Sequence, residues 1–193
     1  IRRQRQMCIR DRNTMDYVTI QSTGNAVDFG DINADKNTPS AVSSSTRGIW
    51  CVTTSYPVHG DLQYVNIKTT GNTVDFGNIG IGLNYQSGGG SSATRGMFAG
   101  GYLSNTISYV TMATTGNSID FGDLTTRRYY FNNMTSPTRC VFGAGLTMPG
   151  SAKSNIMDYV EIATTGNAVD FGVMAFLTSQ GYSGGGSNAH GGV

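Results

Sequence analysis

The chain has few charged residues: Asp, Glu, Lys and Arg make up 13% of its 193 residues, against roughly 25% in typical soluble domains. The shortage of Glu, Lys and Leu excludes long charged helices and coiled coils. No stretch approaches the roughly 20 apolar residues of a membrane-spanning helix. Aromatic residues still reach 10%, and Gly accounts for 27 positions. This balance favours an all-β protein rich in Gly, Ser and Thr, with enough large side chains for a core.

Groups that carry catalysis or bind metals are also scarce. The two histidines, His59 and His190, occupy unrelated positions and have no partners at metal-ligand spacing. No Ser-His-Asp or Cys-His arrangement stands out from the repeated Ser-rich stretches. Cys51 and Cys140 lie about two repeats apart, so we expect buried free thiols rather than a disulfide. The sequence therefore predicts no catalytic residue, no metal and no cofactor.

Residues 1–12, IRRQRQMCIRDR, differ from everything that follows and contain five Arg. Codons for Met7 to Asp11 can be written so that they resemble a transposase adapter used for sequencing libraries. We therefore treat residues 1–12 as a non-native segment and the chain as a metagenomic fragment; the alternative is a basic arm that binds nucleic acid or anionic lipid. Without this segment 8 basic and 11 acidic residues remain, and the net charge changes from +1 to −3. Nucleic-acid binding then has no support.

The remaining chain is a repeat. A Tyr-Val motif returns at residues 16–20, 63–67, 108–112 and 158–162, each time followed by Thr-Gly-Asn and then by Val or Ile before Asp-Phe-Gly. The phenylalanines are Phe29, Phe76, Phe121 and Phe171, with steps of 47, 45 and 50 residues. A Thr-Arg pair recurs at Arg47, Arg95 and Arg139, and His190 falls in the fourth position. Self-similarity at this period is typical of propeller blades and other repeat arrays.

Each unit is predicted to contain four short strands. The first, as at residues 41–45, is small and polar; the second, as at 49–52, is apolar and follows the Arg. The third, at 17–20, has the β-branched and aromatic residues that suit strands. Gly-Asn predicts a two-residue hairpin to the fourth strand. Alternation there places Val27 and Phe29 on one face. No window has a helical period, so we expect minimal helix; a β-solenoid is the alternative architecture.

Four strands per unit and the pair Gly100–Gly101 resemble a kelch-type β-propeller, and the resemblance covers residues 13–193. The match departs from the kelch pattern because Phe stands in place of the kelch Trp. The resemblance implies about four blades of four antiparallel strands. The units are about 15–61, 62–106, 107–156 and a truncated 157–193. We expect an arc of a larger ring; a closed four-blade ring, with one blade shared between the two ends of the chain, is the alternative.

The combination TTGNxxDFG with TRGxF-GGY is similar to repeats of predicted marine phage and marine bacterial proteins, which in phages are usually described as virion or tail-fibre components. This resemblance implies a non-enzymatic structural or adhesive module in a virion or an extracellular setting. Its partners would be a host-surface glycan or protein, or other virion subunits. The alternative is a fragment of a galactose-oxidase-like propeller enzyme whose catalytic residues lie in other blades.

Other motifs have simpler explanations. Asp-Phe-Gly occurs four times without the companions of a kinase site, so it is predicted to be a structural turn. Residues 31–37 space oxygen ligands like the start of a calcium loop, but the Gly and Glu of such a loop are missing; a solvated turn is the expected structure and calcium the alternative. Asn133 begins a glycosylation sequon, a weak signal at this position. The Arg positions are predicted to make structural contacts between strands rather than a ligand cluster.

Unit length varies in one connection. Tyr to Phe is always 12 residues, whereas Arg to the next Tyr is 17, 14 and 20 residues. The variation therefore falls between the second and third strands, in loops that a rigid scaffold can present for recognition. In a propeller these loops share a face with the fourth-to-first connections. The predicted contact residues are Tyr56, His59, Tyr102, Asn105, Met148 and Lys153, with Arg128 and Tyr129 from a fourth-to-first connection. Neutral drift of an unselected loop is the alternative.

Overall fold

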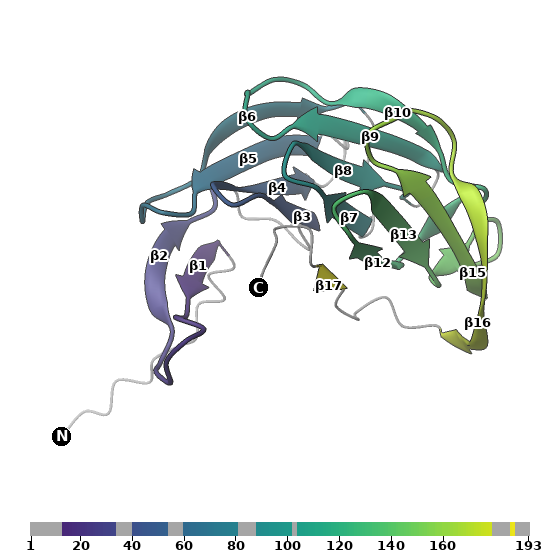
Figure 1. Ribbon diagram of the computed structural model, residues 1–193, viewed down its shortest axis with the longest axis horizontal. Helices are drawn as coiled ribbons and strands as arrows, with labels where there is room; N and C mark the ends of the chain where they lie inside the picture. The colour runs from purple at the N-terminus through teal and green to yellow at the C-terminus, as the bar shows by residue number, and fades with distance from the viewer. Residues whose placement is uncertain are drawn as a thin grey trace, which may run out of the picture.

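The computed structural model describes residues 13–33, 40–53, 60–80, 88–101, 104–178 and 186–187. All regular structure in these residues is β-strand, and they contain no helix. The prediction of an all-β fold is confirmed. The strands form successive antiparallel sheets that follow one another along an arc, from β1 and β2 at one end to β15 and β16 at the other (Figure 1).

Four sheets follow the sequence repeats, and we name them I to IV. Sheet I contains β1 (Thr14–Tyr17) and β2 (Val27–Asp31). Sheet II contains β3 (Ser40–Ser43), β4 (Arg47–Thr53), β5 (Gly60–Asn66) and β6 (Val74–Ile79). Sheet III contains β7 (Gly88–Ser91), β8 (Arg95–Ala99), β9 (Thr106–Thr111) and β10 (Ile119–Asp123). Sheet IV contains β12 (Asn132–Thr135), β13 (Arg139–Gly143), β15 (Ala152–Glu161) and β16 (Val169–Thr178). The predicted four strands per unit are present in sheets II, III and IV.

Three short strands extend sheet IV. β11 (Arg128–Tyr129) pairs with β14 (Leu146–Thr147), and β14 pairs with β15, both antiparallel. β17 (Gly186–Ser187) pairs in parallel with β12. The first strand of the unit after sheet IV therefore starts beside sheet IV.

The first strands of successive sheets lie on the concave side of the arc (Figure 1). They approach each other closely: the Ser91 hydroxyl donates to the Ser43 carbonyl at 2.8 Å. A Cβ added to Gly90 would lie 2.7 Å from the Thr135 Oγ1 of β12, the first strand of sheet IV. This crowding explains why β7, which lies between β3 and β12, consists of Gly and Ser.

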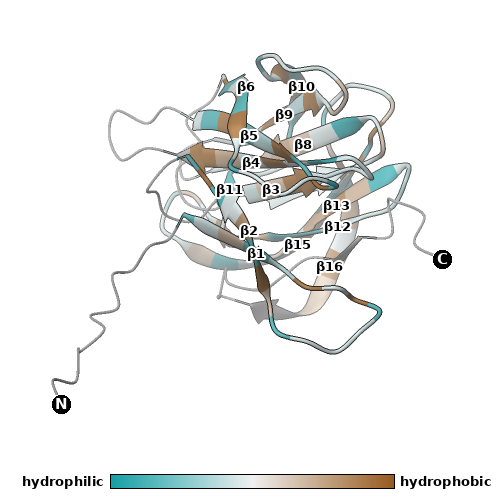
Figure 2. Ribbon diagram, turned by 90° about the vertical axis from the view of Figure 1, so that its left-hand side faces the viewer, coloured by the Kyte–Doolittle hydropathy of each residue, from teal (hydrophilic) through white to brown (hydrophobic). Residues whose placement is uncertain are grey.

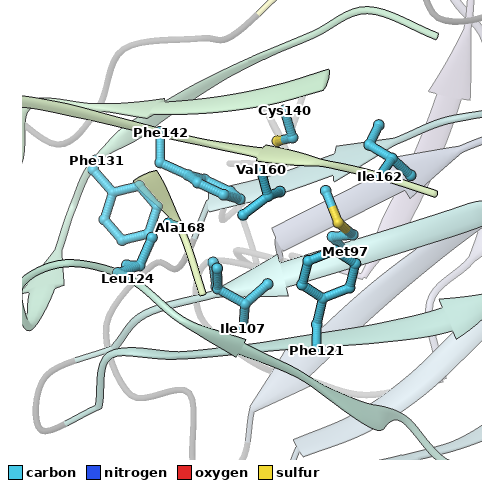
Figure 3. Close-up of a cluster of buried hydrophobic side chains, with 11 residues drawn as sticks. Met97, Ile107, Phe121, Leu124, Phe131, Cys140, Phe142, Val160, Ile162 and Ala168 are labelled. Carbon is cyan, nitrogen blue, oxygen red and sulfur yellow. The ribbon is translucent and has the colours of Figure 1, made fainter. Parts of the chain in front are cut away.

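The core is divided among the spaces between sheets. Sheets II and III share a cluster that includes Ile49, Leu62 and Phe76 from one sheet and Phe98 and Val110 from the other. Figure 3 shows the equivalent cluster between sheets III and IV, where Met97, Ile107 and Phe121 meet Cys140, Phe142 and Val160. A smaller cluster joins sheets I and II. Each sheet is therefore buried by packing face to face against the next one.

The Thr-Gly-Asn segments connect neighbouring sheets. The Gly amide of each sheet from II to IV donates to the Phe carbonyl of the preceding sheet. The bonds are Gly71 to Phe29 (2.7 Å), Gly116 to Phe76 (2.7 Å) and Gly166 to Phe121 (2.8 Å). The Asn Oδ1 accepts from the backbone amide two residues after that Phe. These bonds are Asp31 to Asn72 (3.0 Å), Asn78 to Asn117 (3.0 Å) and Asp123 to Asn167 (3.1 Å). The predicted two-residue turn was wrong: residues 67–73 join β5 to β6, because Gly and Asn bond to the preceding sheet.

Asp-Phe-Gly forms a β-bulge in the fourth strand. In sheet II, Gln63 pairs with Asp75 and Leu62 pairs with Gly77, so Phe76 is the extra residue. The Asp75 carboxylate accepts the Gly77 amide at 3.1 Å. Gly77 has φ of +142°, and a Cβ there would lie 2.4 Å from the Gly116 carbonyl oxygen. Only Gly permits this approach of the next sheet's hairpin.

Burial separates the Val and Phe of the fourth strand. Phe76 is 2% exposed, whereas Val74 is 56% exposed. The Phe76 ring packs edge-on against Tyr64, with centroids 5.8 Å apart, and the same pair recurs in the other sheets. The following sheet covers Phe but leaves the first residue of the strand exposed. Phe171, at 52% exposure, belongs to sheet IV, which no further complete sheet covers among the described residues.

We predict that Gly77→Ala destabilises the protein more than Gly71→Ala. Both positions have positive φ, which costs a residue with a Cβ about 1–3 kcal/mol. A Cβ at Gly71 meets nothing within 4 Å, whereas one at Gly77 collides with backbone. Denaturant unfolding of the two variants measures the difference. Equal losses would mean that the hairpin does not approach the bulge this closely.

We predict that Phe76→Ala and Phe171→Ala differ in their effect on unfolding, although both residues occupy the same repeat position. Phe76→Ala should cost about 3–5 kcal/mol because it empties a buried site between two sheets. Phe171→Ala should stay within about 1 kcal/mol because its ring is half exposed. Thermal and denaturant unfolding test this pair, with measurements on dilute protein. Similar losses at both sites would contradict the face assignment.

Candidate functional site

The repeated arginines bind the neighbouring sheet. The Arg47 guanidinium lies over the Tyr64 ring, 4.8 Å from its centroid, and Nη1 donates to the Met112 carbonyl at 3.1 Å. Arg95 lies over Tyr109 in the same way, at 4.6 Å, and Nη1 donates to the Ile162 carbonyl at 2.7 Å. Each Arg thus joins its sheet to the end of the third strand in the following sheet. This geometry supports the predicted structural role.

Arg139 is the equivalent residue of sheet IV. Its guanidinium lies over Tyr159 at 5.0 Å and pairs with Glu161 at 2.5 Å on the surface. Both partners of this ion pair are about half exposed, so the pair adds little stability. Arg139 has the same orientation over Tyr as Arg47 and Arg95, but the described residues place no following third strand against it.

The predicted contact residues fall into three groups. Tyr56, His59 and Tyr102 lie outside the described residues. Asn105 and Met148 are partly buried, and Lys153 is exposed. Asn105 is held by a bond from its Nδ2 to the Leu124 carbonyl at 3.4 Å. Arg128 and Tyr129 form the third group.

Arg128 and Tyr129, predicted as contact residues from a fourth-to-first connection, are buried, with exposures of 0% and 5%. Arg128 Nη2 pairs with Asp158 Oδ2 at 2.5 Å, and Nη1 donates to the carbonyls of Ile156 (2.7 Å) and Ala144 (3.0 Å). The Tyr129 hydroxyl donates to Ser151 Oγ at 2.7 Å. The two side chains therefore point into sheet IV and anchor its connections. Burial lowers the pKa of Arg128 from its ordinary value, and the Asp158 carboxylate opposes this shift.

Asp158 is the partner that the sequence reasoning missed. Besides Arg128, it accepts the Thr125 hydroxyl at 2.6 Å, and its side chain is fully buried. It stands directly before the repeated Tyr-Val pair. Gln63, at the same position in sheet II, accepts from the Asn33 amide at 3.0 Å and donates to the Asn33 carbonyl at 3.1 Å. In both sheets this position binds the connection from the preceding sheet, and comparing the repeats position by position would have identified it.

The buried pair anchors a hairpin that, among the described residues, is present in sheet IV alone. Arg128 pairs with Thr147 across β11 and β14, and Leu146 pairs with Lys153 across β14 and β15. β15 has 10 residues, against 7 in β5 and 6 in β9. Residues 148–151 turn between β14 and β15, and residues 149–153 are exposed. We call residues 148–153 the hairpin tip. The longest of the variable connections is thus an ordered projection on the scaffold.

A pocket of about 340 Å³ lies between sheets I and II. Its lining is mostly apolar and includes three aromatic rings. The residues are Met15, Asp16, Tyr17, Phe29, Trp50, Val65, Ile67, Lys68 and Thr70. In the next interface, Phe98, the equivalent of Trp50, is fully buried in a cluster with Val42 and Ile49 from β3 and β4. Sheet I has no equivalent of β3 and β4 among the described residues, and the pocket lies where such strands would pack.

The two cysteines among the described residues are not candidates for catalysis. Cys51 and Cys140 are buried free thiols, as predicted. Burial raises the pKa of each to about 12, so both stay protonated near neutral pH and are poor nucleophiles. The described residues hold no cluster of His, Cys, Asp and Glu suited to a metal ion.

Comparison with known proteins gives no assignment: no protein family and no curated protein matches the chain. None of the described residues forms a helix that is long and apolar enough to cross a membrane.

We predict that Asp158→Ala lowers the free energy of unfolding by about 3–5 kcal/mol, because it leaves the Arg128 guanidinium buried without its counter-charge. The double variant Arg128→Met/Asp158→Leu removes both charges and should lose less than the single variant. Denaturant unfolding of both proteins measures the difference. A double variant less stable than Asp158→Ala would contradict the anchoring role of the pair.

Proposed function

We propose that this chain is a non-enzymatic structural and adhesive module, part of a virion fibre or a surface protein, built as an arc of a kelch-like β-propeller. The arrangement of the sheets supports the architecture. Sheets II to IV each have four antiparallel strands, pack face to face and place their first strands on the concave side (Figure 1). β1 and β2 pair only with each other among the described strands, which supports an arc rather than a closed ring of four.

The use of the repeated polar residues supports a non-enzymatic role. Arg47 and Arg95 bond to the following sheet, Asp75 closes the bulge, and Asn117 caps the preceding strand. These side chains are engaged in holding the sheets together. Recognition is therefore assigned to residues that do not repeat.

The observation that carries the proposal is the anchored hairpin tip. A loop that drifts without selection needs no buried ion pair, yet Arg128 and Asp158 fix this hairpin with both side chains fully buried. A rigid scaffold that presents a variable connection is the usual arrangement of a recognition surface. The tip offers Pro149, Ser151 and Lys153, a weakly charged surface suited to a glycan or a protein on a host cell.

The test compares two changes of the tip with a matched control. In the first variant, Asn-Gly replaces residues 148–151, which keeps the pair Thr147–Ala152 and removes the turn. The second is Lys153→Ala. The control, Lys68→Ala, makes the same change at the opposite end of a third strand. Binding is measured on immobilised glycans and on host-surface protein extracts, after unfolding curves have shown intact folds.

We expect both tip variants to weaken binding at least about tenfold and the control to bind like the parent. Unchanged binding by correctly folded tip variants would remove the hairpin tip from consideration. Binding that is lost only in Lys68→Ala would move the site to the opposite edge of the sheets.

A further inference from the structure

The hairpin contact between neighbouring sheets does not distinguish one sheet from another. The Gly amide donates to the Phe carbonyl at 2.7, 2.7 and 2.8 Å, and the Asn Oδ1 accepts a backbone amide at 3.0, 3.0 and 3.1 Å. Figure 2 views the molecule from the end with β1 and β2, and sheets II to IV lie behind them. By this contact alone, a hairpin would fit the bulge of a wrong sheet, or of another copy of the chain, as well as that of its own neighbour.

The sheets do differ beside the start of each connection. The fourth residue after the Phe, where the chain leaves a sheet, is Asn33, Gly80 or Thr125. Its backbone amide donates to a side chain of the following sheet at all three interfaces. The accepting side chain differs from one interface to the next, so this contact is specific where the hairpin contact is not.

Sheet II accepts its connection with two neutral side chains. The Asn33 amide donates to Gln63 Oε1 at 3.0 Å and to Thr73 Oγ1 at 2.8 Å. The Gln63 side-chain amide donates to the Asn33 carbonyl at 3.1 Å, and the Thr73 hydroxyl donates to Gln63 Oε1 at 2.5 Å. Both side chains are buried. Gln63 is thus matched to a neutral peptide group that both donates and accepts.

Sheet III accepts its connection with a single hydroxyl. Ser118 occupies the position that Thr73 has in sheet II, and its Oγ accepts the Gly80 amide at 3.0 Å. Ser108 occupies the position of Gln63 and is buried. Sheet III therefore presents neither a charge nor an amide group at these two positions.

Sheet IV accepts its connection with a charge. Ala168 has no hydroxyl at the position of the accepting Ser or Thr, and Asp158 accepts instead. The Asp158 carboxylate accepts the Thr125 amide at 3.3 Å and the Thr125 hydroxyl at 2.6 Å. It also pairs with Arg128, three residues further along the same connection, at 2.5 Å. This sheet is therefore matched to a connection that carries a cation.

A wrong pairing would leave a buried charge without its partner. Residues 80–87, which follow sheet II, contain no charged residue. If sheet IV packed on sheet II, this connection would leave the fully buried Asp158 without a counter-charge. If sheet III packed on a second sheet III, Arg128 would meet Ser108 in place of a carboxylate. An unpaired buried charge is strongly unfavourable, so both arrangements are disfavoured although their hairpin contacts are intact.

We propose that these side chains determine the order of the sheets: they match each sheet to its own neighbour, and they prevent like sheets from exchanging within the chain or between copies. Misassembly and domain swapping are characteristic failures of repeat proteins, and buried polar groups select one arrangement in other repetitive packings. The hairpin contact then supplies stability at every interface, and the matching side chains supply the choice of partner. This inference does not depend on the proposed adhesive function.

Refolding by rapid dilution from denaturant, over a roughly hundredfold range of protein concentration, tests the proposal because exchange between copies increases with concentration. Sedimentation velocity measures the fraction that is recovered as oligomers. The test variant is Arg128→Met/Asp158→Leu, which removes the charge match of sheet IV without leaving an unpaired charge. The control is Phe76→Ala, which destabilises an interface but leaves all the matching side chains in place.

We expect the double variant to form at least about threefold more oligomer than the parent at the highest concentration. Phe76→Ala should give no more oligomer than the parent, although it is expected to be the less stable variant. Arg128→Lys, which keeps the charge match and loses hydrogen bonds to backbone carbonyls, should also refold like the parent.

The proposal is overturned if the double variant refolds like the parent, or if the amount of oligomer follows stability so that Phe76→Ala exceeds the double variant. Equal oligomer formation by Arg128→Lys and the double variant would overturn it as well. A double variant that yields no folded protein even at the lowest concentration would show that the pair is needed for the fold of sheet IV itself, and this outcome also contradicts the proposal. Refolding and binding are separate measurements, so failure of the adhesive proposal gives a different result.

Discussion

The structure depends on the close approach of one glycine hairpin to the bulge of the preceding sheet. The hairpin amide reaches the Phe carbonyl at 2.7–2.8 Å at all three interfaces. This distance is possible only because the bulge residue facing the hairpin, such as Gly77, has no Cβ. The bulge also inserts Phe76 as an extra residue in the strand, where its ring is buried between the sheets. One backbone contact thus fixes the spacing of the sheets, the burial of the aromatic position and the reach of Arg47 to the next sheet.

Much of the fold follows from the repeat, because strand content and strand order are local properties of a periodic sequence. The four strands of sheets II to IV were predicted in this way. The repeat period does not predict which side chains of each strand are buried. Val74 and Phe76 have the same apolar character two residues apart, yet one is exposed and the other buried, because burial depends on which part of the strand the next sheet covers. The Gly-Asn pair was misread for the same reason: its hydrogen-bonding partner is in another sheet.

The candidate site was harder to predict because it departs from the repeat. Arg128 belongs to a non-repeating connection, and an arginine in such a segment is normally exposed. Its partner Asp158 lies 30 residues further on and looks like an ordinary member of the Tyr-Val motif. Only the three-dimensional structure shows that Asp158, a residue of the repeat, contacts Arg128, a residue of a non-repeating connection. Lys153, in contrast, could be predicted to be exposed, because it lies in the connection where the units differ in length.

Identical residues at one repeat position provide an internal measure of what is missing around them. Phe76, Phe121 and Phe171 each stand between Asp and Gly in the same strand position, so their exposures of 2%, 3% and 52% differ because of packing and not because of local propensity. Val65 and Val18 also share one repeat position, and their exposures of 5% and 59% differ for the same reason at the other end of the arc. The exposure at one repeat position therefore reports whether a neighbouring sheet packs on that residue. A repeat sequence defines the strands of every unit, but each unit is buried only as far as the sheets beside it extend.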